Sequence, residues 1–315
     1  MKSCLVSGFN GFLGTALARK LLGHGVRVVG LVRDRNFKSV LDVHNKCSVV
    51  YGDLQDADVI RYALSHYEVD TIFHLGAMTI LRQSVVDPMT CYRTNVMGTV
   101  NVLEAARQVG VKKVVVASSD KAYGTYDELP YVETFPVQSS PDAYSTSKAC
   151  GDLITQSYAS GYELDASIVR AGNIYGPGDL NLSRLVPRST LKCLADDPPQ
   201  IYRGVGGYKR EFMYIDDVVD AYLVVQERGL PGEAYNVGGS GFLSIIDTVD
   251  KIVKLTGCTK QPEIVDKDFV EIKEQYLDSS KIEDLGWECK VKIDEGLERA
   301  VEWYKKYQDV YQLRV

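Results

Sequence analysis

The chain has 315 residues, of which 45% are hydrophobic and 25% charged, and its 42 acidic and 36 basic side chains give a formal charge of −6. This length allows one large domain or two interlocked lobes, and the composition excludes a disordered or fibrous chain. No run of about five or more Lys or Arg residues occurs, so a nucleic-acid partner is not expected.

Neither a membrane partner nor secretion is expected. No stretch approaches the roughly 18 apolar residues that span a bilayer, and a glycine-rich turn beginning at Gly8 leaves no room for a signal peptide. The seven cysteines form no close pair and the four histidines never fall at metal-ligand spacing, so neither a disulfide framework nor a metal site is predicted. We therefore expect a cytoplasmic protein.

The first half of the chain alternates short β-branched runs with longer amphipathic stretches. Several apolar runs are nearly continuous, which is typical of parallel strands covered by helices on both faces. The predicted fold class is therefore α/β, with a doubly wound parallel sheet of the Rossmann type. Strands are predicted at residues 4–7, 26–32, 48–51, 71–75, 114–118 and 166–169, and helices at 15–22, 56–66, 96–108 and 144–159.

After Gly172 the pattern loosens into a stretch rich in Gly, Pro and Asp, and then becomes helical again. No repeat or flexible linker separates the two halves, so we expect a smaller C-terminal lobe that is interleaved with the sheet. The later helices are predicted at 215–226, 245–256 and near 297–307. The predicted lobes comprise residues 1–172 plus about 207–240, and about 173–206 plus 241–315.

A nucleotide-binding turn is predicted where residues 4–14 read CLVSGFNGFLG. Glycine permits a tight turn, a close approach of a pyrophosphate to the backbone, and close packing of the next helix, whose N-terminus offers free N–H groups. The spacing is GxxGxxG rather than GxGxxG, but its place at the first strand-to-helix junction predicts a dinucleotide site. We assign to it Gly8, Asn10, Gly11, Phe12, Leu13 and Gly14.

The end of the second predicted strand, GLVRDRN, determines how the adenosine ribose is held. Asp34 could bond a free 2′-hydroxyl, whereas Arg33 and Arg35 could pair with a 2′-phosphate, or the three charges could simply mark the return of the chain to solvent. The choice between NAD and NADP stays open. Asp53 is placed to meet the adenine edge, or is an ordinary loop aspartate, and we also assign Leu54 and Leu75 to the cofactor.

Tyr144 and Lys148 in AYSTSK lie one helical turn apart and project from one face of a predicted helix. A nearby ammonium favours the phenolate, so we expect Lys148 to lower the pKa of Tyr144 and make it a base for alcohol oxidation. The chain has 20 tyrosines, so this spacing alone carries little weight. It gains weight from Ser119, Asp120 and Lys121, which follow the apolar run 114–117, because open α/β sheets place their chemistry at such strand ends.

A series of motifs follows in order along nearly the whole chain: SGFNGFLG, GDLQD, FHLGA, NVMGT, SSDKAYG, YSTSK, RAGNIYGPGD, REFMYIDDVVDAY, NVGG and LGW. The series resembles the extended short-chain dehydrogenases/reductases, in their nucleotide-sugar epimerase/dehydratase branch. This resemblance implies that Ser119, Tyr144 and Lys148 form an oxidation triad, and that Asn95 supports the nicotinamide side. It also implies that the nucleotide diphosphate of a sugar contacts Asn173, Leu185, Val186 and Arg210.

The sub-branch depends on Asp120 and Lys121, a pair that resembles the CDP-glucose 4,6-dehydratases and some UDP-N-acetylglucosamine 4,6-dehydratases. Arg82 and Ser84 in ILRQS also resemble the CDP-glucose type and are assigned to the substrate. Alternatively, Asp120 caps a turn and Lys121 is a solvated surface charge. The segment IYRGVGGYKRE is one residue longer than the usual segment of the family before Arg210. This difference predicts that the phosphate-binding site near Arg210 has a different shape.

The resemblance implies a 4,6-dehydratase that converts an NDP-hexose, linked to CDP, UDP or dTDP, into its 4-keto-6-deoxy form with a tightly bound and recycled NAD or NADP. In this reaction Tyr144 serves C4 oxidation, Asp120 protonates the leaving 6-hydroxyl and Lys121 takes the C5 proton. A 4-epimerase would use the same triad without a task for Asp120, and a dinucleotide-binding sensor would keep the fold without turnover. Related enzymes pair through two helices, here 96–108 and 144–159, so a homodimer is implied.

Overall fold

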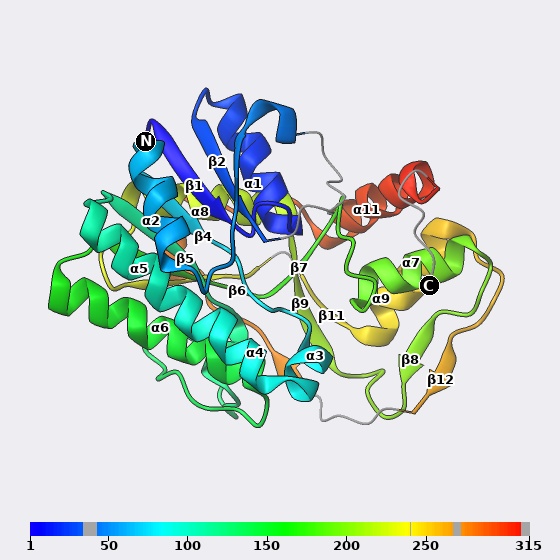
Figure 1. Ribbon diagram of the computed structural model, residues 1–315. Coiled ribbons are helices and arrows are strands. Elements are labelled where there is room, and N and C mark those ends of the chain that lie inside the picture. Colours follow the sequence, from blue (N-terminus) through cyan, green and yellow to red (C-terminus); the bar gives the residue numbers. More distant parts are fainter. Residues whose placement is uncertain (34–42, 240, 267–271, 310–315) are drawn as a thin grey trace.

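A seven-stranded parallel sheet forms the centre of the larger lobe (Figure 1). The computed structural model describes residues 1–33, 43–239, 241–266 and 272–309. The strand order is β10-β6-β5-β4-β1-β2-β3, so the winding direction reverses between β1 and β4, where such sheets bind ligands at their carboxyl ends. The strands are β1 (Ser3–Ser7), β2 (Arg27–Val32), β3 (Ser48–Tyr51), β4 (Thr71–His74), β5 (Lys113–Ala117), β6 (Ala166–Ala171) and β10 (Ala234–Val237).

Helices cover both faces of this sheet, which confirms the predicted doubly wound α/β class. Cys4 and Val6 of β1 pack with α1 and α8 on one face, and Leu5 packs with α2, α5 and α6 on the other, because successive strand residues alternate sides. None of the helices in the described part of the chain is long and apolar enough to cross a membrane. The helices are α1 (Phe12–Gly23), α2 (Ala57–His66), α5 (Gly98–Val109), α6 (Ala143–Tyr162) and α8 (Ile215–Arg228).

The smaller lobe contains a second sheet in which β9 (Lys209–Tyr214) pairs with β7, β11 and β13. Helices α7, α9 and α11 pack together beside it (Figure 1), and a two-stranded ladder joins β8 to β12. The remaining bounds are β7 (Asn173–Tyr175), β8 (Gln200–Tyr202), β11 (Phe242–Ser244), β12 (Glu263–Val265), β13 (Glu274–Gln275), α7 (Leu185–Leu194), α9 (Ile245–Thr256), α10 (Ser280–Glu283) and α11 (Ile293–Tyr307).

The two lobes are interleaved along the chain. Strand β6 ends at Ala171 in the large sheet, and β7 begins at Asn173 in the smaller one. Within residues 207–240, β9 pairs in the smaller sheet, whereas α8 and β10 lie with the large sheet. The division into two lobes at particular residues stays a prediction.

A buried ion pair joins α6 to the large sheet. Arg170 of β6 lies with its Nε 2.6 Å from Oδ2 of Asp152, and the two side chains are only 3% and 1% exposed. A second guanidinium nitrogen of Arg170 donates to the Tyr123 hydroxyl at 2.8 Å, and that hydroxyl donates to Asn236 of β10 at 2.7 Å. Because Tyr123 belongs to the short 3₁₀ helix Asp120–Tyr123 after β5, the network fixes three strand ends and one helix together.

Breaking this pair should strongly destabilise the fold. Asp152→Ala leaves the Arg170 guanidinium buried without its counter-charge, so the free energy of unfolding in denaturant should fall by about 3–5 kcal/mol. The matched control is Asp58→Ala, which removes an exposed partner of Arg61 and should change stability by at most about 1 kcal/mol. Equal effects of the two substitutions would contradict a structural role for the buried pair.

Candidate active site

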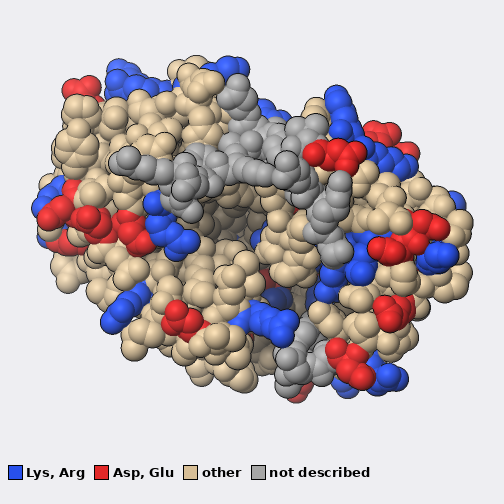
Figure 2. Space-filling view, turned by 45° about the vertical axis from the view of Figure 1, so that its right-hand side comes forward, with Lys and Arg blue, Asp and Glu red and all other residues tan. Residues whose placement is uncertain are grey.

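A cavity of about 1070 Å³ lies at the carboxyl ends of β1 and β4. Its wall combines residues 10–12 after β1, the segment from Met78 to Arg82 after β4, and residues 177–184 from the smaller lobe. Figure 2 shows the surface hollowed between the two lobes, with basic side chains in and beside the hollow. The cavity therefore lies at the reversal of the strand order, where the sequence predicts the dinucleotide.

Glycine is required at two positions of the turn after β1. Gly8 has a φ of +67°, and a Cβ there would lie 2.8 Å from the Cα of Gly76 in the segment after β4. A Cβ on Gly14 would lie 2.2 Å from the carbonyl oxygen of Gly8. The turn therefore packs tightly between β1, β4 and α1, and side chains at these positions would push the three apart.

The N-terminus of α1 faces the cavity without a covering side chain. Gly11 is the exposed N-cap and supplies no side-chain cap, and Asn10 and Phe12 line the cavity beside it. A Cβ on Gly11 would meet only the Gly8 carbonyl oxygen, at 3.1 Å. The first N–H groups of α1 and this bare backbone fit the pyrophosphate of a dinucleotide. Leu13 packs instead against the apolar clusters beneath the turn.

The residues predicted for the adenosine end follow the ends of β2, β3 and β4. Arg33 is exposed directly after β2, and Asp34 lies outside the described residues. The Asp53 carboxylate accepts a bond from the backbone N–H of residue 55 at 2.9 Å, and Leu54 is 9% exposed. Leu75 follows β4, where its N–H donates to the Ser7 hydroxyl at 3.1 Å.

Asn95 lies in a π-helical turn, Arg93–Met97, that precedes α5. Its Oδ1 accepts from the Met78 N–H at 2.7 Å, and its Nδ2 donates to the Ser147 hydroxyl at 2.8 Å. Such turns often occur at functional sites because the extra residue redirects a side chain. Asn95 therefore joins the cavity segment after β4 to α6, which carries Tyr144 and Lys148.

The predicted triad residues are brought to the carboxyl end of β5. Helix α6 is capped by Asp142, whose carboxylate accepts the Ser145 N–H at 2.7 Å. Lys148 donates to the Ala117 carbonyl at the end of β5 at 2.8 Å, and its Nζ lies 5.9 Å from the centre of the Tyr144 ring. Ser119 lies two residues beyond β5, near enough to the Tyr144 hydroxyl to lower the pKa of that tyrosine by hydrogen bonding.

The pKa values of this group differ from the sequence expectation that Lys148 lowers the pKa of Tyr144. Burial raises the pKa of Tyr144 to about 12, and the charge of Asp120 acts in the same direction, while the Ser119 bond and the charge of Arg184 oppose it. Burial also lowers the pKa of Lys148 to about 8, against the charge of Asp152. The expectation is wrong because desolvation outweighs the pairwise attraction.

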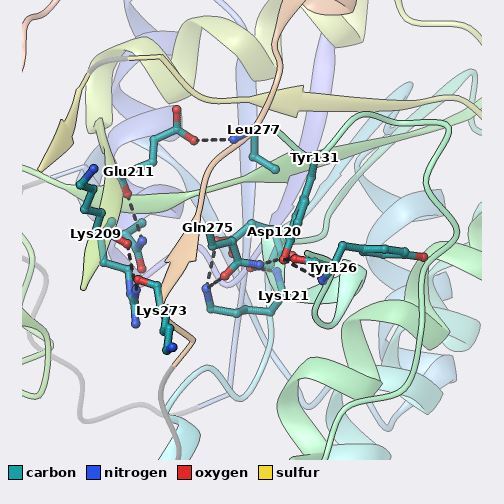
Figure 3. A network of polar contacts seen from close by, with 12 residues as sticks. Asp120, Lys121, Tyr126, Tyr131, Lys209, Glu211, Lys273, Gln275 and Leu277 are labelled. Carbon is teal, nitrogen blue, oxygen red and sulfur yellow. Dashed lines mark hydrogen bonds and ion pairs between the residues drawn. The ribbon is translucent and has the colours of Figure 1, made fainter. Parts of the chain in front are cut away.

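Asp120 and Lys121 are neither a turn cap nor a solvated charge. Ser119 caps the 3₁₀ helix, and the Asp120 side chain is 5% exposed. One Asp120 carboxylate oxygen accepts the Ser119 hydroxyl at 2.8 Å, and the other lies 3.0 Å from Nζ of Lys121. Figure 3 shows that Lys121 also meets Gln275 of β13, to whose Oε1 it donates a hydrogen bond.

The residues predicted for the substrate divide into two groups. Arg82 lines the cavity, but Ser84 is buried and its hydroxyl donates to the Leu81 carbonyl within the short helix α3 (Leu81–Val86), which precedes α4 (Pro88–Tyr92). Arg210 of β9 bonds the carbonyls of residues 209 and 273 at 2.9 and 3.2 Å. The other three residues belong to the smaller lobe. Asn173 begins β7 and Leu185 begins α7, and Val186, the next residue of α7, is 3% exposed.

Sequence reasoning missed two charged residues of this region. Arg184 lines the cavity at the start of α7, pairs with Asp179 at 3.0 Å, and lowers the pKa of Tyr144 through its charge. Glu211 of β9 is 5% exposed, and its carboxylate accepts the N–H groups of residues 239 and 277 at 2.6 and 3.1 Å. Burial raises the pKa of Glu211 to about 7. In the sequence, Glu211 could have been noticed as a single acidic residue next to the apolar residues of EFMY.

Comparison with known proteins identifies the family. Residues 4–238 match the model of the NAD dependent epimerase/dehydratase family. The chain belongs to this family. It is 32% identical to a UDP-glucose 4-epimerase of Mycolicibacterium smegmatis, over 96% of this chain and 98% of that protein.

Solved structures of epimerase/dehydratase proteins resemble this one over nearly its whole length. A UDP-glucose 4-epimerase of Thermotoga maritima with UDP-glucose superimposes with a TM-score of 0.91 at 28% identity, covering 96% of this chain and 99% of that one. A dTDP-glucose 4,6-dehydratase of Streptomyces venezuelae with NAD gives 0.90 at 29%, covering 98% of each. The relatives thus divide between the two activities, and the family comprises NDP-sugar 4,6-dehydratases and 4-epimerases.

Proposed function

We propose that this member of the epimerase/dehydratase family is an NDP-hexose 4,6-dehydratase, a lyase that forms an NDP-4-keto-6-deoxy sugar. The observation that carries the proposal is the buried contact between Asp120 and Lys121, 3.0 Å apart and beside Tyr144. Oxidation and reduction at C4 need only the triad, whereas elimination needs both an acid and a base. An acid–base pair next to the triad has a task in dehydration and none in epimerisation.

In the proposed first step Tyr144 accepts the proton of the sugar 4-hydroxyl, and Ser119 shares the hydrogen bond while C4 becomes a ketone. When bound, the dinucleotide supplies a reversible hydride acceptor and, in its oxidised form, a positive ring charge that favours the Tyr144 phenolate. Lys148, held at the Ala117 carbonyl, keeps a positive charge near the same ring below a pH of about 8.

In the proposed second step the new ketone acidifies the C5–H bond, and the Lys121 amine removes that proton. Asp120, as a carboxylic acid, protonates the 6-hydroxyl as the C6–O bond breaks and water leaves. We propose that a proton passes from Lys121 to Asp120 across their 3.0 Å contact before elimination, which leaves the acid and the amine that this step requires. The hydride given up by C4 would return to C6 while C5 regains a proton, so no external reductant is needed.

Asp120→Asn separates this proposal from the 4-epimerase alternative, which the Mycolicibacterium relative favours. The amide keeps the shape of the side chain but cannot protonate the 6-hydroxyl, so water loss from the NDP-hexose should fall by about two to four orders of magnitude while C4 oxidation continues. Reduced-nicotinamide absorbance and product mass measure the two steps. Tyr144→Phe should abolish both signals together. Water release by Asp120→Asn at the wild-type rate would contradict the proposal.

We also propose that the cofactor is NAD rather than NADP, in keeping with the NAD-bound Streptomyces dehydratase. Arg33→Ala should leave the affinity for NAD within about threefold, because this exposed side chain has no 2′-phosphate to pair with. The dissociation constants of both dinucleotides measure this. A wild type that prefers NADP, together with a loss of about 1.5–3 kcal/mol for NADP alone in Arg33→Ala, would contradict it.

The proposed assembly is a homodimer through α5 and α6. These helices pack side by side, and large apolar side chains are exposed on α6 and on the short helices and the π-helical turn that precede α5. Patches of this kind mark protein interfaces more often than free surface. The exposed residues are Leu81, Val85, Val86, Met89, Tyr92, Met97, Leu153 and Tyr162.

A charge placed on this surface should disrupt the dimer. Leu153 of α6 is 55% exposed, and Leu153→Glu should give a monomer in light scattering at micromolar concentration, because an unpaired carboxylate would be buried at the interface. Leu230→Glu is the matched control, since Leu230 is 62% exposed beyond the end of α8. A wild-type monomer, or a Leu153→Glu dimer, would contradict this interface.

A further inference from the structure

Gln275 meets the predicted acid–base pair from a strand that is remote in sequence. It lies in β13 of the smaller lobe, 155 residues from Asp120, and is 1% exposed. Its Oε1 accepts a hydrogen bond from Nζ of Lys121, and its Nε2 donates to the Asp120 backbone carbonyl at 2.9 Å (Figure 3). A single amide therefore contacts both residues of the pair and is satisfied at both ends.

The position of Gln275 is fixed from both sides of β13. On one side it pairs in parallel register with Arg210 of β9. The carboxylate of Glu211, also in β9, accepts the Leu277 N–H at 3.1 Å, and away from β9 the Tyr131 N–H donates to the carbonyl of residue 276 at 3.0 Å. The amide is therefore placed by the backbone of two elements and not by its own flexible stem.

We infer that Gln275 is a positioning residue that holds the Lys121 amine beside Asp120 through the elimination step. This inference rests on the proposed dehydratase function. As an ammonium, Lys121 is held by its attraction to the Asp120 carboxylate, but that attraction disappears once the proton has passed to Asp120. A neutral amine on a four-carbon stem would then be free to swing away. Gln275 accepts an N–H from the amine as well as from the ammonium, so it keeps the base in place in both forms.

The same geometry leaves one direction of the Lys121 nitrogen for substrate. The ammonium has three N–H donors, of which one faces Asp120 and one faces Gln275. The Lys121 side chain is 26% exposed, whereas those of Asp120 and Gln275 are almost fully buried. Once the proton has passed to Asp120, rotation about the Cε–Nζ bond turns the lone pair to this third direction, where it takes the C5 proton, while Gln275 accepts one of the two remaining N–H bonds.

The experiment compares Gln275→Leu, Gln275→Glu and a control in the same strand, Glu274→Ala. The Glu274 side chain is 45% exposed and lies 3.8 Å from Nζ of Lys209, away from Lys121, so its removal should leave all rates unchanged. Gln275→Leu keeps the volume but cannot tether the amine, so exchange of the C5 proton with solvent deuterium and water loss should both fall by about 10²-fold, while C4 oxidation stays within a few-fold. Gln275→Glu places a second carboxylate beside Nζ of Lys121, which favours the ammonium over the amine, so the pH profile of water loss should move upward.

The possible results are distinct. If the wild type releases water from an NDP-hexose and Gln275→Leu does so at the same rate and with the same pH profile, the inference is overturned and the dehydratase function stands. A parallel loss of C4 oxidation and water release in Gln275→Leu would show a merely structural role and would also overturn it. A wild type that releases water from no NDP-hexose overturns the proposed function and this inference together.

Discussion

The site depends on one buried interaction, the ion pair between Arg170 and Asp152. The pair anchors α6, which carries Tyr144 and Lys148, to β6, which lies between β5 and β10 in the large sheet. Through Tyr123 it also fixes the turn that carries Asp120. Two charged side chains buried this deeply cost more free energy to desolvate than an apolar pair would. Here they fix the position of α6 relative to the turn after β5. The predicted triad and the proposed acid–base pair are therefore held in fixed positions relative to each other.

The two lobes make different contributions to this frame. The large sheet delivers the glycine turn, Ser119 and the start of α6 at the reversal of strand order, so that a dinucleotide and the predicted triad share one edge. The smaller lobe places Arg184 in the wall of the cavity and Gln275 against Lys121. Oxidation at C4 is thus supported by local elements of the first lobe, whereas the proposed elimination also needs a strand from the second.

The parts of the site that the sequence could predict are those coded by local spacing. The glycine turn before α1 and the helical spacing of Tyr144 and Lys148 are visible in short segments, as is the alternation that predicts the doubly wound sheet. The contact of Gln275 with Lys121 joins segments that only the folded chain brings together. The pKa of Tyr144 was predicted in the wrong direction because spacing shows a neighbouring charge but not the burial that outweighs it.

The most direct test of the account is the reaction of the wild-type protein with a panel of NDP-hexoses in deuterated water. The account predicts a product that has lost the mass of one water and carries a single solvent deuterium at C5, because the proposed base exchanges its proton with solvent before C5 is protonated again. A product of unchanged mass that is inverted at C4 and carries no deuterium at C5 would contradict it.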